Sequence, residues 1–398
     1  MNVVINKRLK FQNFVEDVGN AIVFYSEQYC SLFRCHRYGG VAELLYTIPI
    51  KESTRLYGKV YRYKEKIICI PQCAENILIY ELNSREVRFI DLGVYNWGNH
   101  YAEEGGKFLS GVIYEKYLFM IGYWSTCILK FDIEQEEIVN YINLSEDLNI
   151  SIDKRRVCFK NVVLYRGNII LPAYGSNQLF IINPNTMNYQ NLDISNNKGG
   201  FSDIAVASND IWLAPKCQEA FLRLGDSMNV VEVIENFPSD YRRKERANIS
   251  GLIEWKDSIY AMPYMANKIL EITRGDECSN VRIEGEMNDY YTSLGTEKEL
   301  MKFGFVQISN RELFVYCNET NEILVKRDKS KMEICRYLLS QKDGERWLLK
   351  KAGSTDIIIE TEGDLQLLIS GLKDYKVSDG QEIIDEAGHY IYDKICNS

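Results

Sequence analysis

An internal repeat limits most strongly how this chain can fold. Seven segments of the sequence can be laid over one another, and each contains an apolar run, a short polar loop and a second apolar run. Two of them read IICIPQCAENILIYEL from Ile67 and SIYAMPYMANKILEIT from Ser258. Repeats of this kind bury their apolar faces only by stacking on their neighbours. The sequence therefore predicts seven similar structural units.

Each repeat is expected to contain four short strands. A first strand precedes the segments quoted above, and turns rich in Asn, Asp, Gly and Ser join the third strand to the fourth, as tight hairpins require. The apolar anchors of the first strands are spaced 42 to 54 residues apart, which is the period of four-stranded propeller blades. These anchors are Phe11, Tyr57, Leu109, Phe159, Phe201, Ile249 and Phe303.

Two residue types mark the strand ends. Proline closes the second strand in four repeats, because it cannot donate a hydrogen bond to a continuing ladder. Asparagine opens the third strand in four repeats, since it tolerates the left-handed backbone conformation and its side chain can hydrogen-bond the backbone of a turn. The prolines are Pro71, Pro172, Pro215 and Pro263, and the asparagines are Asn76, Asn177, Asn267 and Asn321.

Over roughly residues 11 to 338 the pattern resembles the seven-bladed β-propeller superfamily, and in blade length and strand order it resembles kelch repeats most. The paired glycines of kelch repeats, the Gly-His and Trp-Asp pairs of WD repeats and the Asp boxes of sialidases are absent. The resemblance therefore implies a fold and carries over no catalytic residue. We predict an all-β chain whose residues 1–339 form seven four-stranded antiparallel blades; a β-solenoid or a two-sheet sandwich is the alternative.

The last sixty or so residues have a different pattern. Apolar residues recur at helical spacing after Asp364 and again after Asp379, and both aspartates suit helix N-caps. We predict that residues 340–398 form a small appendage of a hairpin and two helices. It would cover one side of the propeller or, alternatively, bind a partner.

Net charge, apolar runs and cysteine content limit which partners and which cellular compartment we expect. A net charge of -9 argues against nucleic acid and anionic membranes as partners. Charged residues interrupt the apolar start of the chain, and no apolar run is long enough to span a bilayer. The 11 cysteines are scattered singly, as expected for reduced thiols. We therefore expect a cytoplasmic protein.

Loop length predicts which face carries function. In an antiparallel blade, the connections from the fourth strand to the next first strand emerge at the same end as those from second to third. The connections between blades are long here, as in residues 93–107, 145–157 and 237–247, whereas the opposite end has only short turns. Long loops on a rigid scaffold usually carry binding and catalysis. We expect the working face at this end.

A basic residue precedes nearly every first strand. Together these residues would form a positive rim at the channel mouth that attracts carboxylate, phosphate or sulfate, with arginine giving bidentate geometry. The alternative is ordinary surface charge. The predicted ligand-binding residues are Arg55, Lys107, Arg156, Lys198 and Arg246, and Lys10 and Lys302 occupy the same place in their repeats.

Aromatic residues follow the second strands at the same end of the blades. Trp124, Tyr174 and Tyr264 are predicted to stack on a sugar ring or bury a peptide. With 27 tyrosines in the chain, packing between blades is the alternative for most of them individually.

Catalytic and metal candidates are few. His100 lies in a long loop near Glu103 and Glu104 and is the candidate general base. Cys30, Cys35 and His36 resemble a metal cluster only in spacing, because adjacent residues of a strand face opposite sides. No nucleophile elbow, phosphate loop or dinucleotide fingerprint is present, so neither a metal nor a cofactor is predicted.

These observations predict a binding propeller that recognises an anionic small molecule, glycan or peptide at the long-loop face. Two alternatives remain open. The chain could be a lyase or hydrolase acting on an acidic sugar or related metabolite, with His100 and a rim tyrosine as acid and base. It could also be a scaffold with a protein partner.

Overall fold

The computed structural model describes most of the repeat region. The predicted appendage lies almost wholly outside the described residues. These are 8–49, 55–93, 106–148, 157–194, 199–217, 219–245, 248–275, 278–294, 303–328, 331–340 and 343–344. The described chain divides into two compact units.

The first unit combines residues from both ends of the described chain. Its strands are β2 (Ala21–Ser26), β3 (Ser31–His36), β4 (Gly40–Thr47) and β29 (Tyr337–Leu339), and two short 3-10 turns cover Val18–Asn20 and Glu27–Tyr29. The first three strands are antiparallel, whereas β29 joins the free edge of β4 in parallel register. The C-terminal end of the repeat region thus completes this sheet.

The second unit holds Gln12–Glu16 and Arg55–Cys335, and it contains six sheets of four antiparallel strands each. In chain order the strands are β5 (Tyr57–Tyr63), β6 (Lys66–Pro71), β7 (Asn76–Glu81), β8 (Val87–Asp91); β9 (Phe108–Tyr114), β10 (Tyr117–Gly122), β11 (Cys127–Asp132), β12 (Glu137–Asn143); β13 (Val163–Tyr165), β14 (Asn168–Pro172), β15 (Gln178–Ile182), β16 (Tyr189–Asp193); β17 (Phe201–Ala207), β18 (Asp210–Pro215), β19 (Phe221–Leu224), β20 (Val230–Ile234); β21 (Ile249–Trp255), β22 (Ser258–Pro263), β23 (Leu270–Thr273), β24 (Asn280–Ile283); and β25 (Phe303–Ser309), β26 (Glu312–Cys317), β27 (Glu322–Lys326), β28 (Met332–Cys335). Helices α2 (Ser145–Leu148) and α3 (Glu286–Ser293) lie in connections between sheets.

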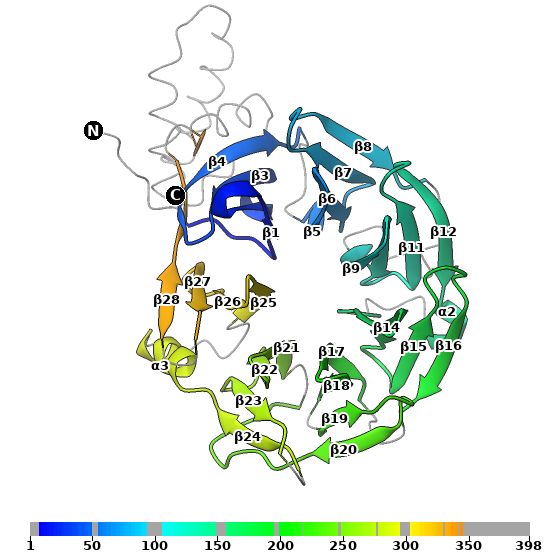
Figure 1. Cartoon of the computed structure of the whole chain (residues 1–398), viewed down its shortest axis with the longest axis vertical. Helices are drawn as coiled ribbons and strands as arrows, with labels where there is room; N and C mark the ends of the chain where they lie inside the picture. The colour runs from blue at the N-terminus through cyan, green and yellow to red at the C-terminus, as the bar shows by residue number, and fades with distance from the viewer. Residues whose placement is uncertain are drawn as a thin grey trace, which may run out of the picture. The chain divides into compact units, whose positions relative to one another are not determined.

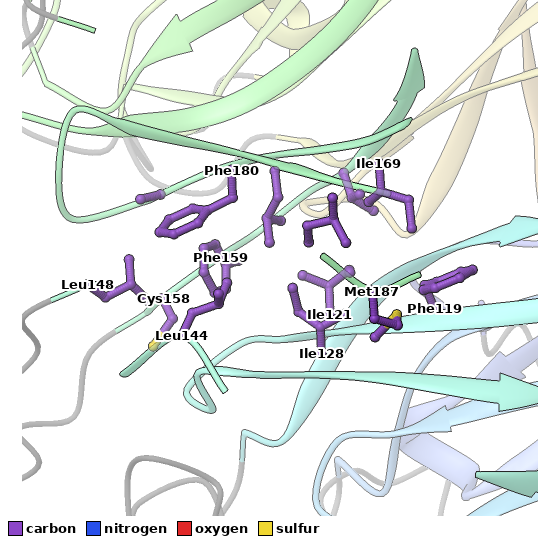
Figure 2. Close-up of a cluster of buried hydrophobic side chains, with 14 residues drawn as sticks. Phe119, Ile121, Ile128, Leu144, Leu148, Cys158, Phe159, Ile169, Phe180 and Met187 are labelled. Carbon is purple, nitrogen blue, oxygen red and sulfur yellow. The ribbon is translucent and has the colours of Figure 1, made fainter. Parts of the chain in front are cut away.

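Within each of these sheets the strands follow chain order, and the first strands of successive sheets contact one another. Figure 1 shows β5, β9, β17, β21 and β25 innermost and the fourth strands outermost. The core lies between neighbouring sheets. Figure 2 shows Phe119, Ile121 and Ile128 of one sheet packed against residues of the next, among them Ile169 and Phe180. This arrangement confirms the predicted all-β, seven-bladed propeller fold.

The residues that mark strand ends behave as predicted. All four prolines are the last residues of their second strands. Asn321 has the left-handed φ of 50°. The Tyr57 hydroxyl donates to Asn76 Oδ1 (2.5 Å), and Asn267 bonds the backbone of Asp240 and Arg242 through its side chain. The asparagines thus act through left-handed backbone or through side-chain hydrogen bonds, as predicted.

The first repeat differs from the prediction that its first strand runs through Phe11. Residues 11–14 form no strand, and β1 (Val15–Glu16) is only two residues long. In the second unit, Asn13 exchanges two 2.8 Å hydrogen bonds with the backbone of Val60 on β5, and Gln307 of β25 bonds the backbone of Phe14. Side-chain hydrogen bonds therefore hold this segment in place of the backbone hydrogen bonds of a longer strand. The segment Gln12–Glu16 connects the first sheet of this unit to its last.

Candidate functional site

The site region is the end of the second unit where the 4→1 and 2→3 connections emerge. Main-chain hydrogen bonds join these connections from one sheet to the next. Cys73 N donates to Arg55 O (3.1 Å), Lys107 N to Gln72 O (2.9 Å), Tyr123 N to Lys107 O (2.8 Å), Cys158 N to Tyr123 O (2.6 Å) and Tyr174 N to Cys158 O (2.9 Å).

The series continues through the later sheets. Phe201 N donates to Ala173 O (3.0 Å), Lys216 N to Gly200 O (3.0 Å), Asn248 N to Lys216 O (3.3 Å) and Tyr264 N to Asn248 O (2.8 Å). We call this set of bonds the collar. Because satisfied backbone groups fix the loops that carry them, the collar holds the side chains at this end in a defined arrangement.

Three of the predicted basic residues, Arg156, Lys198 and Arg246, lie outside the described residues, as does His100. The other two occupy different environments. Arg55 is exposed at the start of the collar. Lys107 is only 5% exposed, and its ammonium donates to the carbonyl oxygens of Cys73 and Ala74 at 3.3 Å. Lys107 thus supports the collar from inside.

The predicted aromatic residues all lie at this end, and all are partly exposed. The Trp124 ring stacks on Tyr123, with centroids 6.2 Å apart and planes at 16°. It also packs over Gly106, where an added Cβ would come within 2.6 Å of the ring. Part of the Trp124 ring therefore packs against the protein.

Tyr174 has a cation partner that the sequence did not single out. The Lys216 ammonium lies 4.7 Å from the centroid of the Tyr174 ring, an attractive cation–π geometry. Gly200, with φ +88°, fits between them, and an added Cβ would collide with the Tyr174 carbonyl. Only glycine combines that conformation with so close an approach. The backbone thus fixes this pair.

Electrostatic contacts connect further residues of this end. Burial raises the pKa of the Tyr123 hydroxyl, Tyr264 raises it further and Arg55 lowers it. These three residues come from the second, third and sixth of the seven repeats, so side chains from separate sheets act on one another here. We call Arg55, Tyr123, Tyr174, Lys216 and Tyr264 the collar face.

The other candidates separate as their strand positions predict. Cys35 is buried on β3, whereas the neighbouring His36 is exposed, and Cys30 occupies a left-handed turn. Within the described ranges, no three His, Cys, Asp or Glu side chains converge to hold a metal ion. No helix of the described chain is long and apolar enough to cross a membrane.

Sequence reasoning missed Lys216, Lys59, Lys160 and Asp203. Lys216 directly follows the proline that ends its second strand, at a position where other repeats carry Gln72 or Tyr264. The other three are charged residues inside or beside first strands, where the pattern is otherwise apolar or small. A charged residue in an inner strand was a usable signal, because burying it requires a reason.

No protein-family model matches the sequence, and no curated protein matches it. Solved structures do. The catalytically inactive virginiamycin B lyase from Staphylococcus aureus with quinupristin is 10% identical, with 81% of this chain and 96% of that chain covered and a TM-score of 0.58. A chain of the mitotic checkpoint complex is 9% identical (85% and 95% covered, TM-score 0.53), and the RRP9 WD40 repeats are 9% identical (79% and 89% covered, TM-score 0.50).

These neighbours are a lyase, a chain of the mitotic checkpoint complex and a set of WD40 repeats, and none of the three is described as a kelch protein. At such low identity the likeness concerns the fold and not the activity. The chain is a seven-bladed β-propeller.

Proposed function

We propose that the protein is a binding propeller whose collar face recognises an anionic small molecule, glycan or peptide. The observation that carries the proposal is the collar, whose backbone hydrogen bonds bring Arg55, Tyr123 and Tyr264 to one end of the second unit together with the Tyr174–Lys216 pair. Two cations and three partly exposed aromatic rings at one end of a chain of net charge -9 form a local positive site.

The chemistry of these residues defines what they would bind. The Arg55 guanidinium offers a planar pair of donors to a carboxylate, phosphate or sulfate. The tyrosine rings offer flat apolar surfaces with a polar edge, which suit sugar rings and peptide side chains. Binding should therefore combine an ionic contact with stacking, and salt should weaken it.

The test is ligand-induced thermal stabilisation, with glucuronate, inorganic sulfate and a glutamate-rich peptide as probes at low and high salt. For a probe that binds, Arg55→Ala combined with Lys216→Ala should weaken affinity about tenfold or more, which corresponds to losing about 1.4 kcal/mol. Lys331→Ala is the matched control, since Lys331 is exposed in a 3→4 turn at the opposite end. Equal affinity in the double variant, or binding insensitive to salt, contradicts the proposal.

The stacking component has its own test. Tyr174→Phe keeps the ring and should bind as the wild type does, whereas Tyr174→Ala should bind more weakly. If binding depended on the Tyr174 hydroxyl, Tyr174→Phe would instead weaken it.

The lyase among the structural neighbours keeps an enzymatic role open, although no observation of the described residues favours it. That lyase structure is of a histidine-to-alanine variant that is catalytically inactive. The only histidine of the described ranges is His36, which is exposed on β3 in the first unit. The enzyme hypothesis therefore depends on His100, and binding of a protein partner, as WD40 proteins suggest, remains the second alternative.

A further inference from the structure

A second group of charged residues lies on or just before the first strands, apart from the collar face. Lys59 belongs to β5, Lys160 comes shortly before β13, and Asp203 belongs to β17. Each of the three is close enough to the other two to influence their ionisation. Three separate sheets of the second unit thus direct charged side chains to one place.

The hydrogen bonds of this cluster are incomplete. Lys160 Nζ donates to Ser250 O at 2.7 Å, and Asp203 Oδ2 accepts from Leu252 N at 2.5 Å. Asp203 is only 3% exposed, yet its Oδ1 has no hydrogen bond of normal geometry in the described chain, although the Asn161 side chain and Ile204 N lie near enough to the carboxylate to lower its pKa. The Lys59 ammonium likewise has no acceptor among the described residues. The cluster therefore lacks one donor and one acceptor.

The charges are also unbalanced. Two lysines face one carboxylate, and burial of unpaired charge is unfavourable. Accordingly, burial lowers the pKa of Lys59 and of Lys160 and raises that of Asp203, although Asp203 partly offsets the effect on the lysines. Lys59 and Lys160 are both partly exposed as residues, so solvent reaches part of each of them. A bound anion would restore the balance.

We propose that Lys59, Lys160 and Asp203 bind a small oxyanion that bears an O–H group. The anionic oxygens accept hydrogen bonds from Lys59 and from the remaining protons of Lys160, and the O–H group donates to Asp203 Oδ1. Hydrogen phosphate and small hydroxycarboxylates both have this chemistry. The site is independent of the proposed function, because it contains no residue of the collar face.

The unpaired Asp203 oxygen makes the site selective. Sulfate has the shape of phosphate but carries no proton to donate, and propionate differs from lactate by the missing hydroxyl. An anion without the O–H group would bring its own oxygens against the carboxylate. Removing one partner of a buried polar group is unfavourable, so phosphate should bind about tenfold or more tightly than sulfate.

Isothermal titration of the full-length protein in slightly alkaline buffer tests this, with phosphate against sulfate and lactate against propionate. Preference within the first pair identifies phosphate, and preference within the second identifies a hydroxycarboxylate. Equal binding within both pairs, or no binding of any of the four, overturns the proposal.

Variants then locate the site. Lys59→Met should abolish most of the binding, whereas Lys331→Met, which removes an exposed lysine elsewhere, should not. Asp203→Asn can still accept from Leu252 N but presents an N–H in place of Oδ1, so it should lose the preference for phosphate over sulfate. Selective binding should survive Arg55→Ala combined with Lys216→Ala. Loss of selective binding in that double variant would assign it to the collar face instead.

Discussion

Among single residues, the buried pair of Lys326 and Glu284 shows how the sheets are held together. Lys326 Nζ lies 2.7 Å from Glu284 Oε1, and both side chains are 4% exposed. Lys326 belongs to β27, whereas Glu284 follows β24 of the preceding sheet and its Oε2 accepts from Met287 N in α3. One carboxylate thus bonds a neighbouring sheet and a helix start.

Glu284→Ala should destabilise the protein by about 3 kcal/mol, because the buried Lys326 ammonium keeps only the more exposed Glu286 and Met287 N loses its acceptor. The matched control is Glu286→Ala. Glu286 contacts the same lysine at 3.2 Å but is 39% exposed, so its loss should cost less than about 1 kcal/mol. Urea denaturation measures both, and similar losses for the two variants would contradict this assignment.

The Asp132 carboxylate gives stability a defined pH dependence. Burial acts to raise its pKa, but Lys116 at 2.7 Å and the backbone N–H groups of Glu134 and Gln135 outweigh burial, so its pKa is lowered. A carboxyl group with a lowered folded-state pKa stabilises the protein above its unfolded pKa of about 3.9, and that stability disappears as pH falls through the folded value.

Asp132→Asn should remove the negative charge and keep the turn. In the next sheet Asn183 makes the same turn, with its Oδ1 accepting from Asn185 N and Thr186 N. The variant should be less stable than the wild type at neutral pH, and the difference should shrink once the pH falls below about 4. Denaturation across a pH series checks this. A stability difference between wild type and variant that grows as the pH falls would contradict this prediction.

At the level of elements, the segment Gln12–Glu16 has the clearest role. Asn13 bonds β5, and Gln307 of β25 bonds the same segment from the other side. The segment therefore ties the first and last sheets of the second unit together without forming a long strand.

Asn13→Ala should destabilise the protein by about 1–3 kcal/mol, because the N–H and carbonyl of buried Val60 both lose their partner. Gln307→Ala should have a smaller effect of the same sign. The double variant should lose less than the sum, since either loss already loosens the segment. Strict additivity in a double-mutant cycle would show that the two anchors act independently.

Considering the whole molecule, the repeat period and strand-end residues were enough to predict the fold. Pro71 and its equivalents mark strand ends through local backbone chemistry, which sequence records directly. The site was only partly predictable. Lys107 has the same spacing as Arg55, yet it points inward to carbonyl groups, and spacing does not encode that direction.

The inner cluster shows a second limit of prediction. Lys59 and Asp203 are far apart in the chain, and only the arrangement of successive sheets brings them into electrostatic contact. Likewise, the Lys216 ammonium lies over the Tyr174 ring, while Gly200 accepts a hydrogen bond from Lys216 N and packs against the Tyr174 carbonyl. Such relations depend on three-dimensional closure rather than on local pattern.

The proposed binding of ligands at the collar face concerns the second unit as a whole. Hydrogen–deuterium exchange with and without the probe that stabilises the protein most tests it directly. We expect added protection in the 2→3 connections at residues 71–76, 122–127, 173–178 and 263–269, with no change in the turns at 63–66, 114–117 and 165–168. Protection confined to those turns, or to the outer strands β8, β12 and β16, would contradict it.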